Sequence, residues 1–479
     1  MTVRKRNTAH EAEEVPESFE STSNATTSSH SSESAVSSVE TKDVQPWPPI
    51  VVEPPDWPHG LDTKEVVDEK RFRLFHWGPI IALSIIGYIS AVTTHFMMMW
   101  WPFTTPDGLI HFSIFMLWNY LTLSNMFTAS FIGGGYISKN WNPPKEEHKD
   151  QLQFCKPCNG YKAPRSHHCS KCNACVLKMD HHCPWINNCV GHRNHGYFIR
   201  FLFFAIIGCL HAVTVHVICA YHLVHQKLTT AMAEKYSRNI AYYQSLGLPD
   251  WLSTHQMMHS SVVVWYMRFG TGSEPLIGIT FWSLIALVGA SAFAFGVVVG
   301  LTGLLYFQLK GIWKNRTGIE DYIDQKAQGR RDDDETGSQW FYPYDLGWKR
   351  NCNEVLFSSW NGRTNGNGVW WPVAEPCDQF TLTEEQLAQK EAKRRMARLV
   401  EINGDFRGGI FGSCSFGCKV FFCQPISEDL RVKVVPGEKW VITQATKYWF
   451  YGNKFGQESA PKGWFPRSVA TLLEDRPYR

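Results

Sequence analysis

Four long apolar runs constrain this chain more than any other feature of its sequence. They cover residues 77–99, 109–132, 198–223 and 276–307. A helix crosses the hydrocarbon core of a membrane with about 20 predominantly apolar residues, and each run reaches that length. Buried core helices of a large soluble protein are the alternative, but such cores seldom need runs this long with so few charges. The runs therefore predict a polytopic α-helical membrane protein with four spans, surrounded by a lipid bilayer.

Lysine and arginine residues near the ends of these runs predict the orientation. Cytoplasmic connections of membrane proteins carry an excess of both residue types. The connection 100–108 has neither, whereas the stretch before the first run, the connection 133–197 and the stretch after the fourth run are basic. We therefore expect a multi-pass protein with both termini and the connection 133–197 in the cytosol, and with residues 225–274 as a lumenal loop.

The N-terminal segment differs in composition from the rest of the chain. Residues 1–45 are rich in Ser, Thr and Glu, and residues 46–58 are rich in Pro and Trp. These residues offer too little apolar surface to offset the entropy cost of ordering the chain. Residues 1–58 are therefore expected to be a disordered tail and linker. The first residues are charged, and a secretory signal is not expected. The formal net charge of +3 gives no electrostatic support for a nucleic-acid partner.

Seven of the fourteen cysteines lie between Cys155 and Cys189. Several are separated by two residues, which lets both thiolates bind one tetrahedral Zn²⁺. A disulfide scaffold is the alternative, but it needs an oxidising compartment. Two closed zinc sites need eight ligands. If one of the seven cysteines does not bind metal, six cysteines remain, and two histidines bring the number of ligands to eight. The spacing therefore predicts two structural zinc ions and one spare thiol, and counting alone does not identify the spare one.

The motif Asp180-His181-His182-Cys183 lies inside this cysteine-rich segment. Within its frame of Cys and His residues, the motif resembles the DHHC protein S-acyltransferases. The resemblance covers the four runs, a cysteine-rich module at 150–200 and a cytosolic tail at 310–375 that packs on the core. It implies that the module lies on the cytosolic side, between the second and third of four spans, as the charge distribution also predicts.

The resemblance also implies a role for each residue of the module. The first zinc site falls on Cys155, Cys158, His168 and Cys175, and the second on Cys169, Cys172, His182 and Cys189. Cys183 is implied to be the acylated nucleophile, His181 the base, and Asp180 the carboxylate that orients His181. The substrate implied is palmitoyl-CoA, and the acceptors are proteins with membrane-proximal cysteines.

The expected chemistry is covalent catalysis in two steps. Cys183 attacks the thioester of the acyl-CoA, and a cysteine of the target protein then takes the acyl group. A zinc ion with three thiolates carries a negative charge, which disfavours a thiolate at Cys183. A proton acceptor such as His181 is therefore needed. Two other readings stay open, a membrane ubiquitin ligase with cross-braced zinc and an inactive zinc scaffold.

Further residues are expected to bind the acyl-CoA. By resemblance, Trp185 lies at the membrane boundary, and Lys162, Arg165 and His167 contact the CoA, although a solvated basic face explains these three equally well. A Thr-Thr-x-Glu motif of the family appears here as Thr317-Gly318-Ile319-Glu320. The second Thr is lost, which puts one polar contact to the active site in doubt. Asn351 is expected to pack the tail against the membrane domain.

The C-terminal part predicts a small β domain at 395–475, after a charged helix from residue 378 to about 400. Strand-like alternation occurs at 431–434 and 440–443, and Gly463-Trp464-Phe465-Pro466 resembles a strand of SH3 domains. The combination resembles the endoplasmic-reticulum subfamily of the DHHC enzymes, which implies an endoplasmic-reticulum membrane. A partner for the SH3-like domain stays open, because the peptide-binding Ala-Leu-Tyr-Asp-Tyr stretch is missing. The resemblance implies S-palmitoylation at Cys414, Cys418 and Cys423, and buried free thiols are the alternative.

Overall fold

The computed structural model describes seven stretches of the chain. They are residues 74–247, 279–332, 339–357, 366–409, 411–427, 429–457 and 461–473. The predicted disordered tail and linker, residues 1–58, lie outside these stretches, as do residues 248–274 of the predicted lumenal loop.

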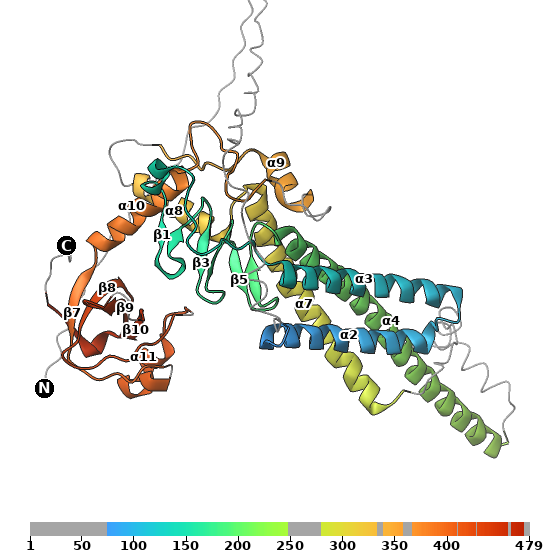
Figure 1. Cartoon of the computed structure of the whole chain (residues 1–479). Coiled ribbons are helices and arrows are strands. Elements are labelled where there is room, and N and C mark those ends of the chain that lie inside the picture. The colour runs from blue at the N-terminus through green and yellow to red at the C-terminus, as the bar shows by residue number, and fades with distance from the viewer. Residues whose placement is uncertain are drawn as a thin grey trace, which may run out of the picture. The chain divides into compact units, whose positions relative to one another are not determined.

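Four long helices correspond to the four apolar runs (Figure 1). They are α2 (Trp77–Trp100), α3 (Pro106–Ile132), α4 (His195–Ser245) and α7 (Phe281–Trp313). The side chains of Thr105 and Thr280 accept backbone N–H groups at the starts of α3 and α7, which satisfies donors that a helix leaves free. Helix α4 continues as far as Ser245, so the first part of the predicted lumenal loop is helical.

Three helices of the described stretches are long and apolar enough to cross a membrane. They are α2, the segment His195–His225 of α4, and α7. Helix α3 has 27 residues but also polar ones such as Asn119 and Asn125, whose amides donate to backbone carbonyls one turn earlier. It therefore differs from the other three in composition and not in length.

Small and polar side chains hold three of these helices together. Ala290 and Ala294 of α7 are fully buried, and side chains this small let helix backbones approach closely. Between the helices, Nε2 of His216 lies 3.0 Å from Thr93 Oγ1 and Nδ1 lies 3.1 Å from Ser291 Oγ. Both ring nitrogens of His216 are thereby partnered, so this histidine joins α2, α4 and α7.

The cysteine-rich segment between α3 and α4 forms three short β-hairpins. They pair β1 (Phe154–Cys155) with β2 (Gly160–Tyr161), β3 (His167–Cys169) with β4 (Ala174–Val176), and β5 (His181–Cys183) with β6 (Asn188–Val190). The 3₁₀ turn η1 (Glu146–Lys149) precedes them, and η2 (Lys156–Cys158) joins β1 to β2. Asn159, Asn173 and Asn187 have positive φ in the three turns, a conformation that Asn tolerates better than most residues. Hairpins this short are not stable alone, so the segment needs cross-links.

The segment after α7 packs against the last turn of α7. It contains α8 (Gly318–Asp332), α9 (Trp348–Cys352), the π-helical turn η3 (Asn353–Phe357) and α10 (Thr381–Arg395). Asn351 donates to the backbone oxygen of Trp313 at 2.8 Å and to Asp345 at 2.7 Å, and it accepts from Leu346 N at 3.1 Å. Asn351 therefore ties this segment to the last turn of α7, which is the structural role expected of it.

The C-terminal part is a five-stranded antiparallel sheet with its own core. In the order β10-β9-β8-β7-β11, its strands are Gly463–Pro466, Trp449–Lys454, Lys439–Ala445, Arg398–Ile402 and Ala470–Leu472. The short helices η5 (Phe411–Phe416), α11 (Cys418–Phe422) and η6 (Arg467–Val469) complete it. Trp440 and Ile442 point inward from β8 and pack with Trp449 and Phe465. The predicted strand at 431–434 is wrong, because only isolated bridges form there.

Candidate active site

Two clusters of Cys and His side chains could each hold a metal ion. The four ligand atoms of each cluster lie within 4.8 Å of one another. The clusters are Cys155, Cys158, His168 and Cys175, and Cys169, Cys172, His182 and Cys189. The fold thus brings together, in two groups of four, the eight residues that the sequence analysis assigned to zinc.

The distances inside the clusters fit zinc. A tetrahedral ion about 2.3 Å from sulfur and about 2.0 Å from nitrogen separates the two ligand atoms by about 3.5 Å. The sulfur–nitrogen distances are 3.3 to 3.6 Å, from His168 Nδ1 to Cys155 and Cys158 and from His182 Nδ1 to Cys169, Cys172 and Cys189. Four protein ligands leave no open position on the ion, which is typical of structural zinc.

Strand geometry explains why the two clusters interleave. Neighbouring residues of a strand point to opposite faces, so β3 presents His168 to the first cluster and the next residue, Cys169, to the second. In β5, His182 pairs directly across the hairpin with Cys189 of its own cluster. His181 and Cys183 therefore lie on the opposite face of β5, and Cys183 belongs to neither cluster.

The face of β5 that carries Cys183 packs against α3 and α4. Cys183 is 3% exposed and lies in an apolar cluster with Met126 of α3 and with Phe198 and Leu202 of α4. The edge of the His181 ring meets the Phe198 ring, with 5.5 Å between ring centroids. The thiol is thus separated from water and lies beside helices that the sequence predicts to be in the membrane.

Asp180, His181 and Cys183 form a connected polar group. Nδ1 of His181 lies 2.6 Å from Asp180 Oδ2, and His181 also hydrogen-bonds the Cys183 side chain. Burial alone would lower the pKa of His181, but the hydrogen bonds with Asp180 and Cys183 raise it to about 10. These contacts therefore stabilise the protonated form of the His181 imidazole.

Asp180 is held by groups outside the cysteine-rich module as well. Its carboxylate is 7% exposed and accepts from Gln308 Nε2 at 3.0 Å and from the backbone N–H of Gly318 at 2.7 Å. Burial would raise the pKa of Asp180, but the hydrogen bonds from His181 and Gln308 and the nearby charges of His195 and His181 together outweigh burial and keep that pKa well below its usual range. The contact that the missing Thr put in doubt is therefore made by a main-chain donor at the start of α8.

Neither Gln308 nor the donor role of Gly318 is among the residues predicted from the sequence. Gln308 follows directly on the fourth apolar run, 276–307, and a lone amide at the end of a predicted span is a signal that could have directed attention to it. The Gly318 contact had no such signal, because a backbone N–H belongs to every residue except proline.

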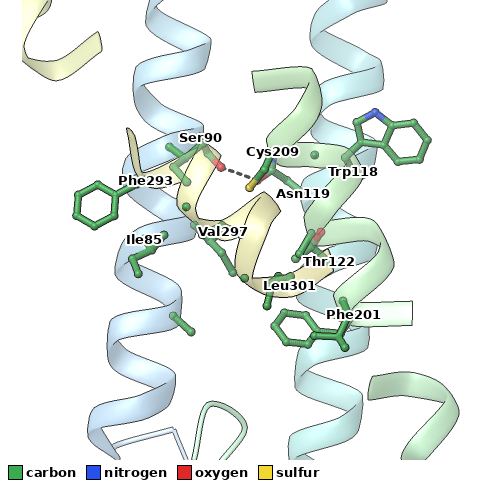
Figure 2. A pocket seen from close by; sticks show the side chains of 18 of the residues that line it. Ile85, Ser90, Trp118, Asn119, Thr122, Phe201, Cys209, Phe293, Val297 and Leu301 are labelled. Atoms are coloured by element: carbon green, nitrogen blue, oxygen red, sulfur yellow. Dashed lines mark hydrogen bonds between the residues drawn. The ribbon is translucent and has the colours of Figure 1, made fainter. Parts of the chain in front are cut away.

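An apolar cavity of about 710 Å³ lies between the four long helices (Figure 2). Residues from α2, α3, α4 and α7 line it, among them Ile85, Phe201 and Leu301. Its few polar groups include Ser90, which donates to Asn119 at 2.5 Å (Figure 2). Phe198, Phe201, Leu202, Leu301 and Leu304 line the cavity and belong to the same packed cluster as Cys183. One part of the cavity is therefore continuous with the surroundings of the thiol.

Trp185, which the resemblance assigns to the membrane boundary, is one of the residues that line this cavity. It is 43% exposed, and its ring centroid lies 5.7 Å from that of Trp77, the first residue of α2. An amphipathic ring in this position suits the border between lipid and water.

The three predicted CoA contacts have different surroundings. The guanidinium of Arg165 is fully buried, bonds both oxygens of Glu320 at 2.7 Å, and lies 4.2 Å from the ring centroid of Tyr344. A group enclosed in this way is part of the scaffold and meets no external phosphate without rearrangement. Burial, and secondly Lys162, lowers the pKa of His167 to about 4. Within the described residues, His167 Nε2 is buried without a hydrogen-bond partner.

Comparison with known proteins identifies the class. Residues 148–325 match the sequence family of the DHHC palmitoyltransferases. This chain belongs to that family and is a protein S-palmitoyltransferase.

Similarity to individual proteins extends well beyond the matched family segment. The chain is 41% identical to palmitoyltransferase ZDHHC6 of Danio rerio over 408 residues, which are 82% of this chain and 90% of the relative. It is 37% identical to palmitoyltransferase ZDHHC6 of Homo sapiens over 407 residues, again 82% of this chain and 90% of the relative. A probable protein S-acyltransferase 16 of Arabidopsis thaliana is 33% identical over 147 residues, 28% of this chain and 51% of that protein.

Proposed function

We propose that this palmitoyltransferase carries the acyl group on Cys183 between acyl-CoA and the target cysteine. The observation that carries the proposal is the position of Cys183 on β5. It lies on the face opposite the metal ligand His182, belongs to neither metal cluster, and is hydrogen-bonded to the Asp180–His181 pair. In each metal cluster, bound zinc stabilises the hairpins that present these side chains.

In the first half-reaction, His181 takes the thiol proton of Cys183 while Asp180 holds the imidazole by its Nδ1–H. The Cys183 sulfur attacks the thioester carbonyl, a new thioester forms on Cys183, and the CoA thiolate leaves with the proton from His181. In the second half-reaction, His181 takes the proton of the target thiol, and that sulfur attacks the acyl-Cys183. The acyl group moves to the target, and the proton returns to Cys183.

The palmitoyl chain is proposed to occupy the apolar cavity between the helices. Its volume of about 710 Å³, its apolar lining and its continuity with the cluster around Cys183 support this assignment. Lys162 and His167 are proposed to contact the CoA moiety and Trp185 the boundary of the slot. Arg165 is proposed to support the site through its ion pair with Glu320.

Substitution of Cys183 tests the proposal directly. With palmitoyl-CoA, the purified protein should acquire a hydroxylamine-labile acyl label, and Cys183→Ser should lose it while zinc stays near two ions per chain. A Cys183→Ser protein that lacks one zinc equivalent would show that Cys183 is a metal ligand. A variant that keeps both its zinc and its label would show that another cysteine carries the acyl group.

We propose four membrane spans in an endoplasmic-reticulum membrane, with both termini and the cysteine-rich module in the cytosol. For α3 the support is its 27-residue length and the exposed apolar side chains of Ile110, Leu117 and Phe131. A tag at residue 250 should be inaccessible in cells whose plasma membrane alone is permeabilised. Access from the cytosol would overturn this topology.

The five-stranded C-terminal sheet is proposed to be an SH3-like domain at 395–475, and its partner is proposed to be another protein. Cys414, Cys418 and Cys423 are exposed, which supports acylation of these thiols by an acyltransferase. Acyl-exchange labelling of the Cys183→Ser background isolates the tail. Substituting all three cysteines there should remove the remaining label, and an unchanged label would refute their acylation.

A further inference from the structure

The hydrogen bonds that hold Asp180 continue to His195, a histidine outside the Asp180–Cys183 motif. Gln308 of α7 donates from Nε2 to Asp180 Oδ2 at 3.0 Å, and His195 Nε2 lies 2.8 Å from Gln308 Oε1. His195 is the first residue of α4, and its side chain is buried. An unbroken series of hydrogen bonds therefore runs from Cys183 through His181, Asp180 and Gln308 to His195.

The chemistry of the groups allows one orientation for each of them. An ionised Asp180 carboxylate only accepts hydrogen bonds, so Gln308 must face it with the amide NH₂. The carbonyl end of Gln308 then faces His195, which must donate from Nε2. Within the described residues, His195 Nδ1 is buried and has no hydrogen-bond partner, which agrees with a ring that carries its proton on Nε2. His195 thereby prevents the Gln308 amide from turning its oxygen toward Asp180.

The same two helices line the proposed acyl slot. Phe198 lies three residues after His195 on α4, Leu304 lies four residues before Gln308 on α7, and both side chains line the cavity. His181 belongs instead to β5, whose hairpin carries His182 and Cys189 of the second metal cluster, and Asp180 directly precedes β5. The Gln308 contact is therefore a direct hydrogen bond between the helices that hold the acyl chain and the pair that activates Cys183.

We propose that Gln308, oriented by His195, is a positioning residue for the acyl transfer. Gln308 holds the carboxylate of Asp180, and thereby the His181 ring, in a fixed position relative to the cavity that is proposed to bind the acyl chain. This inference rests on the proposed function of Asp180, His181 and Cys183.

The test measures acylation of Cys183 by palmitoyl-CoA in the full-length protein. Gln308→Met keeps the length of the side chain and removes both hydrogen bonds. Its kcat should fall about tenfold, because a hydrogen bond to a charged group is lost. The KM for palmitoyl-CoA should change less than about twofold, because the bond does not touch the substrate. Gln325→Met is the matched control, since Gln325 also bonds a carboxylate, that of Asp321, but is exposed on α8. Its kcat should not change.

A double-mutant cycle separates positioning from general destabilisation. His195→Phe should lower kcat about threefold relative to the unsubstituted protein. His195→Gln keeps an N–H donor, so its loss of kcat should be much smaller. In the Gln308→Met background, His195→Phe should have no further effect, because His195 acts only through Gln308.

Three results would overturn the proposal. They are an unchanged kcat in Gln308→Met with two zinc ions bound, additive losses in the cycle, and equal losses for His195→Phe and His195→Gln. If Gln308→Met loses zinc, the comparison of the two His195 variants decides the question. A Cys183→Ser protein that keeps its acyl label would instead refute the proposed function, whatever Gln308 does.

Discussion

The ion pair between Arg165 and Glu320 gives a prediction that can be worked out from the structure. Both side chains are fully buried. Glu320 accepts from Arg165 Nε and Nη2 at 2.7 Å, from Thr317 N at 2.9 Å and from the Tyr342 hydroxyl at 2.9 Å. All of its partners are donors. In Glu320→Gln, one carboxylate oxygen becomes an NH₂ group that must face a donor, and the buried guanidinium loses its counter-charge.

Breaking one side of a buried ion pair costs about 3 to 5 kcal/mol, because the remaining charge stays in a medium that solvates it poorly. For a folding unit of about 200 residues, this corresponds to a melting midpoint lower by roughly 10 °C. The variant should also acylate Cys183 more slowly, because Glu320 holds the first turn of α8, where Gly318 donates to Asp180.

The assay is thermal unfolding of the purified protein in detergent, followed by a thiol-reactive dye. The matched control is Glu391→Gln, since Glu391 and Arg395 form an ion pair of 2.5 Å that is mostly exposed. An exposed pair contributes little, so the control should lower stability by less than about 0.5 kcal/mol. Equal midpoints for the two variants would refute the reasoning that burial makes the Arg165–Glu320 pair important.

Three further substitutions test other parts of the structure. Cys158→Ala removes a ligand of the first cluster, and structural zinc contributes on the order of 10 kcal/mol to folding. Metal analysis should therefore find less than two zinc ions per chain, and proteolysis should cut the cysteine-rich module. Retention of both ions would contradict the ligand assignment. Gly296 lines the cavity, and a Cβ added there has no atom within 4 Å, so Gly296→Leu places a side chain in open space. The rate of acylation by palmitoyl-CoA should then fall about tenfold relative to the rate with an acyl-CoA four carbons shorter. An unchanged ratio of the two rates would show that the acyl chain does not occupy this cavity. Asn351→Ala deletes three hydrogen bonds of a buried side chain and should lower stability by about 2 to 3 kcal/mol, with an unchanged melting midpoint as the contrary result.

Much of the site could be predicted because its constraints are local in the sequence. The two-residue gaps between cysteines reflect the geometry of a tetrahedral ion, and the apolar runs reflect the thickness of a bilayer. Both patterns are properties of short segments, so they can be read without knowing how the segments pack. The spacing predicted two four-ligand sites, and the eight residues that the family resemblance assigned to them are the residues found in the two clusters.

The sequence by itself predicted two sets of metal ligands, helices of membrane length and one cysteine beyond those that the two metal sites need. Only the tertiary structure decided which groups surround that cysteine. Asp180 meets Gly318, 138 positions away, and Arg165 meets Glu320, 155 positions away. The physical reason is that hydrogen bonds and ion pairs act over a few ångströms in space, and only folding brings distant parts of a chain within that range.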